Sequence, residues 1–250
     1  MQKLFSIYQE KFKILDEHLY QYNLNVLNPE NKATNPFCIT IPEDYETYTN
    51  KIMIFGQETN KWCRECGDGG VYSNSLEESL DIYKKFYLSG DFFRYRGPFS
   101  NEFKRIRREI MKSKNAVFLW NNINKIGRMG KGNIHEINQI QFEYFQPIRD
   151  EIQLLKPNIF VFLTGPNYDF FIENNIGKFR QTLISDSIWQ MHFEDENLKS
   201  ITSLKTYHPN ALYLQGKNKI VIPNLINEIK SNCNIISKTN RIFDAPIKCK

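Results

Sequence analysis

Four short apolar runs divide this chain: three of them end at glycine or asparagine, and the fourth ends at a tyrosine that is followed by a histidine. The runs are continuous rather than alternating, which is typical of strands buried on both faces of a sheet. The stretches between them carry apolar residues at helical spacing. Strands that alternate with helices predict a parallel sheet covered on both faces. The four runs are residues 51–56, 115–121, 158–165 and 202–207.

The helices are expected from periodicity between these runs. Residues 3–21 place Leu4, Tyr8, Phe12 and Leu15 on one face, which predicts a helix packed on the core. Residues 28–44 hold three prolines and several asparagines and are expected to be a loop. Further helices are predicted over 75–88, 100–112 and 219–231, and one or two, broken near Pro147, over 134–155.

Composition limits the class of protein. The chain has 250 residues, of which 41% are hydrophobic and 24% charged. These fractions are those of ordinary globular proteins. Its formal net charge of +5 is compatible with a polyanionic partner. Five cysteines without a framework spacing argue against a disulfide scaffold, and the charged N-terminus fits neither a signal peptide nor a membrane span. We expect a cytoplasmic monomer with no membrane association.

Ligands of open parallel sheets bind beyond the carboxyl ends of the strands. The segments that follow the four runs are GQETN, WNNIN, TGPNY and YHPNAL. They bring one acid, Glu58, and one imidazole, His208, to the same edge. A carboxylate can orient water or oppose positive charge on a sugar, and a histidine can donate a hydrogen bond to a departing oxyanion. This pair suits cleavage of a bond whose leaving group departs as an anion.

The segments GQETN, RGPFSNEF, VFLWNNIN, LLKPNIFVFLTG and HPNAL follow one another along the chain. In this order they resemble the motifs of the uracil-DNA glycosylase superfamily. GQETN at 56–60 resembles the first family motif, Gly-Gln-Asp-Pro-Tyr, and HPNAL at 208–212 resembles His-Pro-Ser-Pro-Leu. RGPFSNEF, VFLWNNIN and LLKPNIFVFLTG resemble the segments between those two motifs. The resemblance implies a three-layer α/β/α sandwich with a central four-stranded parallel sheet and no cofactor. It also implies a single domain, 1–250, in which we expect an N-terminal helix and loop at 1–45 and a polar tail at 235–250.

The resemblance also implies roles for individual residues. Glu58 would activate water, and His208 would face the base carbonyl that gains charge as the bond breaks. Leu212 would fill the space left by an extruded base. Phe99 would stack on the base, and Asn121 would form hydrogen bonds with its edge. Gly56 and Gln57, in the first motif, would also contact the base.

Departures from the family pattern affect the pocket. Asn60 stands where the best-known branch has a tyrosine that excludes the methyl group of thymine, so a larger C5 substituent would fit. An insertion at 61–97 separates the first motif from Phe99, and its Trp62 or Tyr72 is an alternative stacking residue. The insertion also holds Cys63 and Cys66, half of a metal site with no second half at useful spacing, so no metal is expected.

Contacts to DNA are expected from a basic, glycine-rich loop and from the segment after His208. The loop, 125–133, follows the second strand end and suits phosphate contacts. Purely structural explanations of these features stay open: a flexible loop at 125–133, a helix-capping role for Glu58 or His208, and a core position for Phe99 or Leu212. Asn122 is an alternative to Asn121 as the residue that contacts the base. The expected DNA contacts are Lys125, Arg128, Lys131, Asn210, Leu212 and Lys217.

These observations favour a DNA glycosylase that hydrolyses the N-glycosidic bond of uracil or of a modified pyrimidine flipped out of DNA. Its setting would be base-excision repair or defence against phage DNA that carries modified bases. Two other functions stay open: a non-catalytic nucleic-acid-binding module on the same fold, and a nucleoside hydrolase. Release of a base from an oligonucleotide separates the first function from the second.

Overall fold

A computed structural model describes residues 2–58, 61–62, 72 and 75–233. Within them the chain is an α/β protein built on one mixed, six-stranded sheet. The strands are β1 (Asn50–Gly56), β2 (Ala116–Asn122), β3 (Ile159–Leu163), β4 (Phe179–Ser185), β5 (Ile188–Phe193) and β6 (Thr202–Thr206). The α-helices are α1 (Gln2–Asn25), α2 (Leu76–Tyr83), α3 (Asp91–Arg94), α4 (Pro98–Met111), α5 (His135–Tyr144), α6 (Ile148–Leu155), α7 (Asp169–Asn175), α8 (Pro209–Leu214) and α9 (Asn218–Asn232). Short helical turns are η1 (Pro29–Asn31), η2 (Tyr45–Thr47), η3 (Lys84–Leu88) and η4 (Pro166–Tyr168).

The four predicted apolar runs all form strands. Their order in the sheet is β2-β1-β3-β6, and each neighbouring pair is parallel. β1 and β3 are buried along nearly their whole length, as continuous apolar strands require. The carboxyl ends of these strands therefore meet along one edge of the sheet, which positions the residues discussed below.

A sheet of four strands is not confirmed, because an antiparallel hairpin extends it to six. β5 pairs with β6, and β4 pairs with β5, both antiparallel. β4 is mostly exposed and polar, so it lacks the continuous apolar character by which the other strands were recognised. The turn between the two strands holds Ser187 in a left-handed conformation, at a φ of 61°. Such a conformation is typical of tight hairpins.

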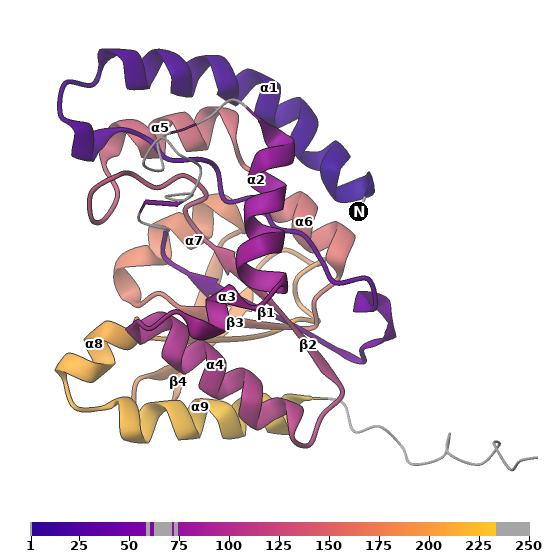
Figure 1. Ribbon diagram of the computed structural model, residues 1–250. Helices are drawn as coiled ribbons and strands as arrows, with labels where there is room; N and C mark the ends of the chain where they lie inside the picture. Colours follow the sequence, from indigo (N-terminus) through magenta and orange to yellow (C-terminus); the bar gives the residue numbers. More distant parts are fainter. Residues whose placement is uncertain (1, 59–60, 63–71, 73–74, 234–250) are drawn as a thin grey trace, which may run out of the picture.

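Helices cover both faces of the sheet (Figure 1). In this view α1, α5 and α6 lie above it, and α4, α8 and α9 lie below it. The predicted N-terminal helix is confirmed: Leu4, Tyr8, Phe12 and Leu15 are buried along one face of α1. This face packs on α5 and α6.

The insertion at 61–97 covers the open edge of the sheet where it is described. β2 is an edge strand, and its outward carbonyl groups need partners. The hydroxyl of Tyr83 donates to the carbonyl of Trp120 at 3.0 Å, and that of Tyr87 donates to Phe118 at 2.7 Å. These two hydrogen bonds satisfy carbonyl groups on the outer side of β2 without a further strand.

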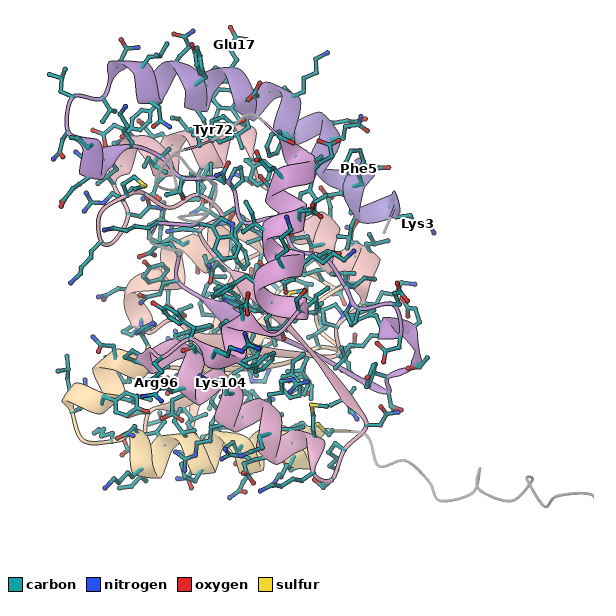
Figure 2. All side chains as sticks on the ribbon, in the orientation of Figure 1. Lys3, Phe5, Glu17, Tyr72, Arg96 and Lys104 are labelled. Carbon is teal, nitrogen blue, oxygen red and sulfur yellow. The ribbon has the colours of Figure 1, made fainter. Side chains whose placement is uncertain are left out.

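Trp62 and Tyr72 do not take the stacking role considered for them. Trp62 is 6% exposed and packs on Phe37 and Trp120 in the aromatic core. Tyr72 is buried against α1, where its hydroxyl donates to Asp16 (Figure 2). Both rings are buried in the interior of the protein.

Among the described residues, no helix is both long enough and apolar enough to cross a bilayer.

Candidate functional site

The end of β3 lies between the two residues expected to do chemistry. β1 and β6 are its neighbours on either side, so Glu58 follows one flanking strand and His208 follows the other. Gln57 ties two of these ends together, since its side-chain amide donates to the carbonyl of Thr164 at 2.7 Å. Both Glu58 and His208 are partly buried. The structure therefore places an acid and an imidazole on the two sides of one strand end.

Glu58 has a specific partner that the sequence did not reveal. The hydroxyl of Tyr168, the last residue of η4, donates a hydrogen bond to the Glu58 carboxylate. Burial raises the pKa of Glu58, because the charged form loses water, and the bond from Tyr168 opposes this rise. Burial and the same contact raise the pKa of Tyr168. The tyrosine is thus a hydrogen-bond donor that holds one oxygen of the carboxylate.

His208 begins α8 as its N-cap residue. The backbone N–H of Asn210 donates to His208 Nδ1 at 3.2 Å. This nitrogen is therefore an acceptor, and the neutral ring carries its hydrogen on Nε2. Burial lowers the pKa of His208 to about 4. The cap uses one ring nitrogen and leaves the other as a donor.

Phe99 lies beside His208 with a nearly parallel ring. The two ring centroids are 6.3 Å apart and the planes differ by 12°. Phe99 is only partly buried, although it also contacts Trp120 and Phe103. Gly56 permits this position, since a Cβ there would lie 3.1 Å from the Phe99 ring. An aromatic face is thus available at the strand ends, next to the imidazole.

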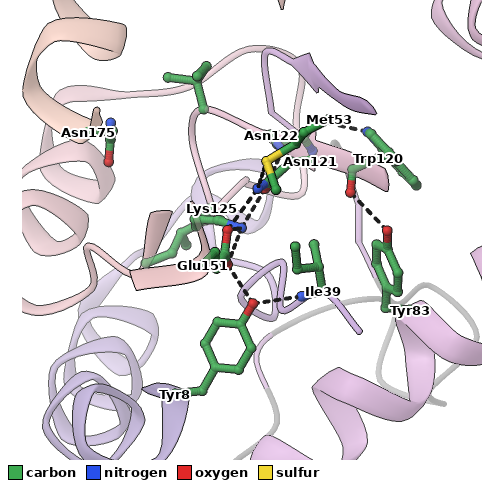
Figure 3. A network of polar contacts seen from close by, with 12 residues as sticks. Tyr8, Ile39, Met53, Tyr83, Trp120, Asn121, Asn122, Lys125, Glu151 and Asn175 are labelled. Carbon is green, nitrogen blue, oxygen red and sulfur yellow. Dashed lines mark hydrogen bonds and ion pairs between the residues drawn. The ribbon is translucent and has the colours of Figure 1, made fainter. Parts of the chain in front are cut away.

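Asn121 is not available to read a base, and this corrects the expectation for it. Its amide nitrogen donates to Glu151 at 2.7 Å, and its amide oxygen accepts from Lys125 Nζ at 2.5 Å. It lies on the sheet face covered by α1 and α6, within the buried network of Tyr8, Lys125 and Glu151 (Figure 3). Residues along a strand alternate between faces, so the next residue points to the other side.

Asn122 is that next residue, and it faces the aromatic side with Phe99. Its Oδ1 accepts a hydrogen bond from Trp120 Nε1 at 3.1 Å and would lie 2.6 Å from a Cβ on Gly56. Asn122 is 1% exposed, and its Nδ2 has no hydrogen-bond partner among the described residues. A buried amide N–H without a partner is costly and suits a ligand.

Two of the expected DNA contacts are used inside the protein. Lys125 is fully buried, and its Nζ contacts Glu151 at 2.7 Å, so it cannot reach a phosphate. Arg128 donates from all three guanidinium nitrogens to its own surroundings: to Gly132 at 3.1 Å, to Asn31 at 2.6 Å and to Lys131. The contacts of Arg128 hold the glycine-rich loop together. The expectation that Lys125 and Arg128 contact DNA is therefore wrong for both residues.

Leu212 cannot act as an exposed wedge, because it is fully buried. Leu214, two residues further along α8, is 82% exposed. The other expected contacts remain at the surface. Lys131 and Asn210 are exposed, and Lys217 forms a surface ion pair with Asp186 at 3.3 Å.

Asn60, Cys63 and Cys66 lie outside the described residues, as does the tail at 235–250. No group of three or more potential metal ligands occurs in the part of the chain that is described. Two surface depressions lie away from the strand ends, one beside His18 and Tyr144 and one beside Lys156 and Asn197. The candidate site at the strand ends is therefore defined by the positions of its side chains and not by either of these depressions.

Sequence reasoning missed three polar groups at this edge. Tyr168 follows β3 in TGPNY, a segment already singled out, and its position after the strand was the available signal. Thr164 and Asn124 are buried beside Gln57, and their side-chain polar atoms have no hydrogen-bond partner among the described residues. The backbone N–H of Asn124 donates to the carbonyl of Gln57 at 2.9 Å.

No family model matches the sequence, and a search of curated proteins finds no match either.

The chemistry open to this edge follows from its residues. It offers a carboxylate with a raised pKa, a neutral imidazole that donates from Nε2, a partly exposed aromatic ring and an unpaired amide. The first two groups are an acid–base pair that can assist loss of an anionic leaving group. The last two suit a planar, polar ring such as a nucleobase.

Proposed function

We propose that this protein is a DNA glycosylase that hydrolyses the N-glycosidic bond of a pyrimidine flipped out of DNA. One observation carries the proposal: Glu58 and His208 follow β1 and β6, the two strands that flank β3, while Phe99 lies beside His208 and both Phe99 and Asn122 lie against Gly56. A flipped nucleotide needs one group at its sugar, another at its leaving base, and a surface that holds the base. These four residues supply those parts.

Glu58 acts on the sugar side of the bond. As the bond breaks, its electron pair leaves with the base and positive charge develops on the sugar. The carboxylate opposes this charge and accepts a proton from the water whose oxygen bonds to C1′. Tyr168 holds one carboxylate oxygen, so the other is left to face the water.

His208 acts on the base side of the bond. The leaving base departs as an anion whose charge spreads onto its ring carbonyl oxygen. Nε2–H of the neutral imidazole donates a hydrogen bond to that oxygen. A neutral donor is supported by the lowered pKa of His208, about 4, which keeps the ring uncharged at physiological pH.

Phe99 and Asn122 hold the base, with Phe99 stacking on its face and Asn122 bonding to its edge. The resemblance to the uracil-DNA glycosylase superfamily then assigns the base-reading asparagine to Asn122 instead of Asn121. The same resemblance underlies the proposal of a three-layer α/β/α sandwich, to which this chain adds the β4–β5 hairpin. No cofactor is needed for this reaction.

A basic surface beside Phe99 supports DNA as the partner. Arg94 and Arg96 precede α4 and are exposed, and Tyr95 between them is 59% exposed. Lys104 Nζ donates to the carbonyl of Tyr95 at 2.6 Å, which brings a further cation to the same place (Figure 2). Arginine and lysine contact phosphates, and an exposed tyrosine can stack on a base. We propose that the protein works on DNA as a cytoplasmic monomer.

Base release from defined oligonucleotides tests the proposal. Labelled strands with one uracil or one 5-hydroxymethyluracil are incubated with the protein, treated with alkali and separated by size. Strand breakage at the modified position is expected, and Glu58→Gln and His208→Ala should each reduce it by about 10²-fold or more. Retention of the strands on a gel without breakage identifies a non-catalytic binding module. Activity on free nucleosides alone identifies a nucleoside hydrolase.

A further inference from the structure

The hairpin that extends the parallel sheet encloses a lysine close to the candidate site in the chain. Lys205 lies on β6, shortly before His208, and its side chain is only 1% exposed. The rings of Phe179 on β4 and Trp189 on β5 lie 5.5 Å and 5.7 Å from its Nζ. Both distances are within the range of a cation–π interaction. The hairpin therefore surrounds a cation on the strand that leads to His208.

Asp169 is the ion-pair partner of this lysine. Lys205 Nζ donates to Asp169 Oδ1 at 2.6 Å. The side chain of Asp169 is 28% exposed, so water reaches the carboxylate while the ammonium group is buried. A buried charge without a partner is costly, so this lysine requires the carboxylate. The ion pair therefore attaches the first residue of α7 to β6.

The same ion pair fixes one end of η4, the turn that carries Tyr168. Asp169 directly follows Tyr168 in the chain. At the other end of the turn, the backbone N–H of Gly165 donates to the carbonyl of Thr206 at 3.0 Å. Both ends of η4 are thus attached to β6, the strand that precedes His208.

Tyr168 extends this attachment across β3 to the acid. Its hydroxyl donates to the carboxylate of Glu58, which follows β1, and β1 lies on the other side of β3 from β6. Burial raises the pKa of Glu58, and this hydrogen bond is the contact that lowers it. A functional side chain keeps its geometry only when the groups behind it are fixed. The position of the hydrogen-bond donor to Glu58 is therefore set from β6.

We propose that Lys205 is a positioning residue: through its ion pair with Asp169, it fixes Tyr168 against Glu58. Lys205 contacts neither the base nor the sugar in the proposed mechanism, and its effect passes through these two protein contacts. The β4–β5 hairpin then has a role in the site, because its two aromatic rings lie beside the ammonium group. The inference rests on the proposed function where it concerns base release, and on the fold where it concerns the acid.

Lys205→Met tests this series of contacts. Methionine keeps a long apolar side chain between the two rings and removes the charge, and the partly exposed Asp169 can be solvated. The pKa of Glu58, measured by nuclear magnetic resonance of its isotope-labelled carboxyl carbon, should rise because the bond from Tyr168 weakens. Base release near pH 6 should fall by about threefold to tenfold, with a smaller loss near pH 8.

The double variant Lys205→Met/Asp169→Asn separates positioning from stability and from charge. It removes both members of the pair, so the net charge beside the site is unchanged and no charge loses its partner. Its resistance to urea should return toward that of the wild-type protein, whereas the pKa of Glu58 should stay raised. Lys11→Met is the matched control, because it breaks the ion pair with Asp150 at 3.0 Å between α1 and α6. It should leave the pKa of Glu58 unchanged.

Tyr168→Phe supplies the decisive comparison. If Lys205 acts through the hydroxyl of Tyr168, Lys205→Met adds nothing to the rise in the pKa of Glu58 that Tyr168→Phe already causes. An equal further rise in that background overturns the inference, as does an unchanged pKa of Glu58 in folded Lys205→Met. Failure of the proposed function looks different: the wild-type protein releases no base, while the pKa of Glu58 still responds to Lys205→Met.

Discussion

The hydroxyl of Tyr168 donates a hydrogen bond to the carboxylate of Glu58, although the two residues are 110 positions apart in the chain. Adjacent strands make this contact possible, because Glu58 follows β1 and Tyr168 follows β3 in the same sheet. Burial raises the pKa of Glu58, and this bond counteracts the rise. The tyrosine therefore favours the ionised form of Glu58, which is the form that accepts a proton in the proposed mechanism.

Replacement of Tyr168 by phenylalanine should make base release more sensitive to acid. The ring stays in place, but the opposing hydrogen bond is lost, so desolvation alone acts on Glu58 and its pKa rises further. The acid limb of the pH–rate profile should move to higher pH, with a loss of about tenfold near pH 6 and a smaller loss near pH 8. Tyr144→Phe is the control, since it removes a comparable bond to Glu143 at the surface. An unshifted acid limb would separate Tyr168 from the function of Glu58.

His208 should stay neutral down to unusually low pH. Its pKa is lowered to about 4 by burial, because the imidazolium form would lose water. The folded protein therefore binds its proton below the unfolded value of about 6.5. Between about pH 6.5 and about pH 4 the unfolded state binds more protons, so stability contributed by this group declines as the pH falls through that window.

Nuclear magnetic resonance of the imidazole Cε1–H group measures this directly. The His208 signal should remain at its neutral position from about pH 8 to about pH 5, whereas an ordinary histidine titrates with a midpoint near about 6.5. His208→Ala identifies the signal by its loss. A midpoint above about 6 would mean that the leaving base meets a charged donor, contrary to the proposed mechanism.

The sequence predicted the elements that have a strong apolar pattern. The four buried strands and α1 were all expected, because burial on two faces or along one helical stripe leaves a visible period. β4 and β5 were missed because they lack such a pattern. β4 is an exposed edge strand, and its residues meet water rather than the core, so their polarity resembles that of a loop.

Two kinds of site residue were predicted wrongly: a residue displaced by one position along a strand, and basic residues whose partners lie far away in the sequence. Asn121 and Asn122 are adjacent, and a shift of one residue along a strand exchanges the two faces of the sheet. Lys125 and Arg128 have the charge expected of phosphate contacts, but their partners Glu151 and Asn31 are distant in sequence. Composition gives no information on such pairings, since they depend on how helices dock. Asn122 became recognisable only once the face of β2 was known.

Leu212 and Leu214 should respond oppositely to truncation. Leu212 is fully buried on the inner face of α8, and Leu214 is 82% exposed. Leu212→Ala should therefore lower the free energy of unfolding by about 2–5 kcal/mol. Leu214→Ala should change it by only about 0.5 kcal/mol or less. Urea unfolding followed by circular dichroism gives both values.

The same two variants test which side chain of α8 meets DNA. If an apolar side chain of this helix inserts into the duplex, Leu214→Ala should weaken binding to duplex DNA while stability is kept. Normal stability of Leu212→Ala would contradict its assignment to the core.

Lys125 should prove to be a residue of stability and not of DNA binding. It is fully buried against Glu151, which also accepts from Tyr8 at 2.5 Å and from Asn121 at 2.7 Å (Figure 3). Lys125→Met leaves the carboxylate buried without its cation, which should cost about 3–5 kcal/mol in the free energy of unfolding. The double variant Lys125→Met/Glu151→Leu removes both charges and should recover about half of that loss.

An exposed ion pair between α1 and α6 provides the control. Lys11 of α1 contacts Asp150 of α6 at 3.0 Å, and about a third or more of each side chain is exposed. Lys11→Met should therefore cost less than about 1 kcal/mol. DNA affinity measured over a range of salt concentrations completes the test. Its salt dependence should be unchanged by Lys125→Met and reduced by Lys131→Ala, because only an exposed lysine can displace counterions from a phosphate. If the Lys125→Met protein is stable and its DNA affinity depends less on salt concentration, Lys125 contacts DNA and its assignment to the core is wrong.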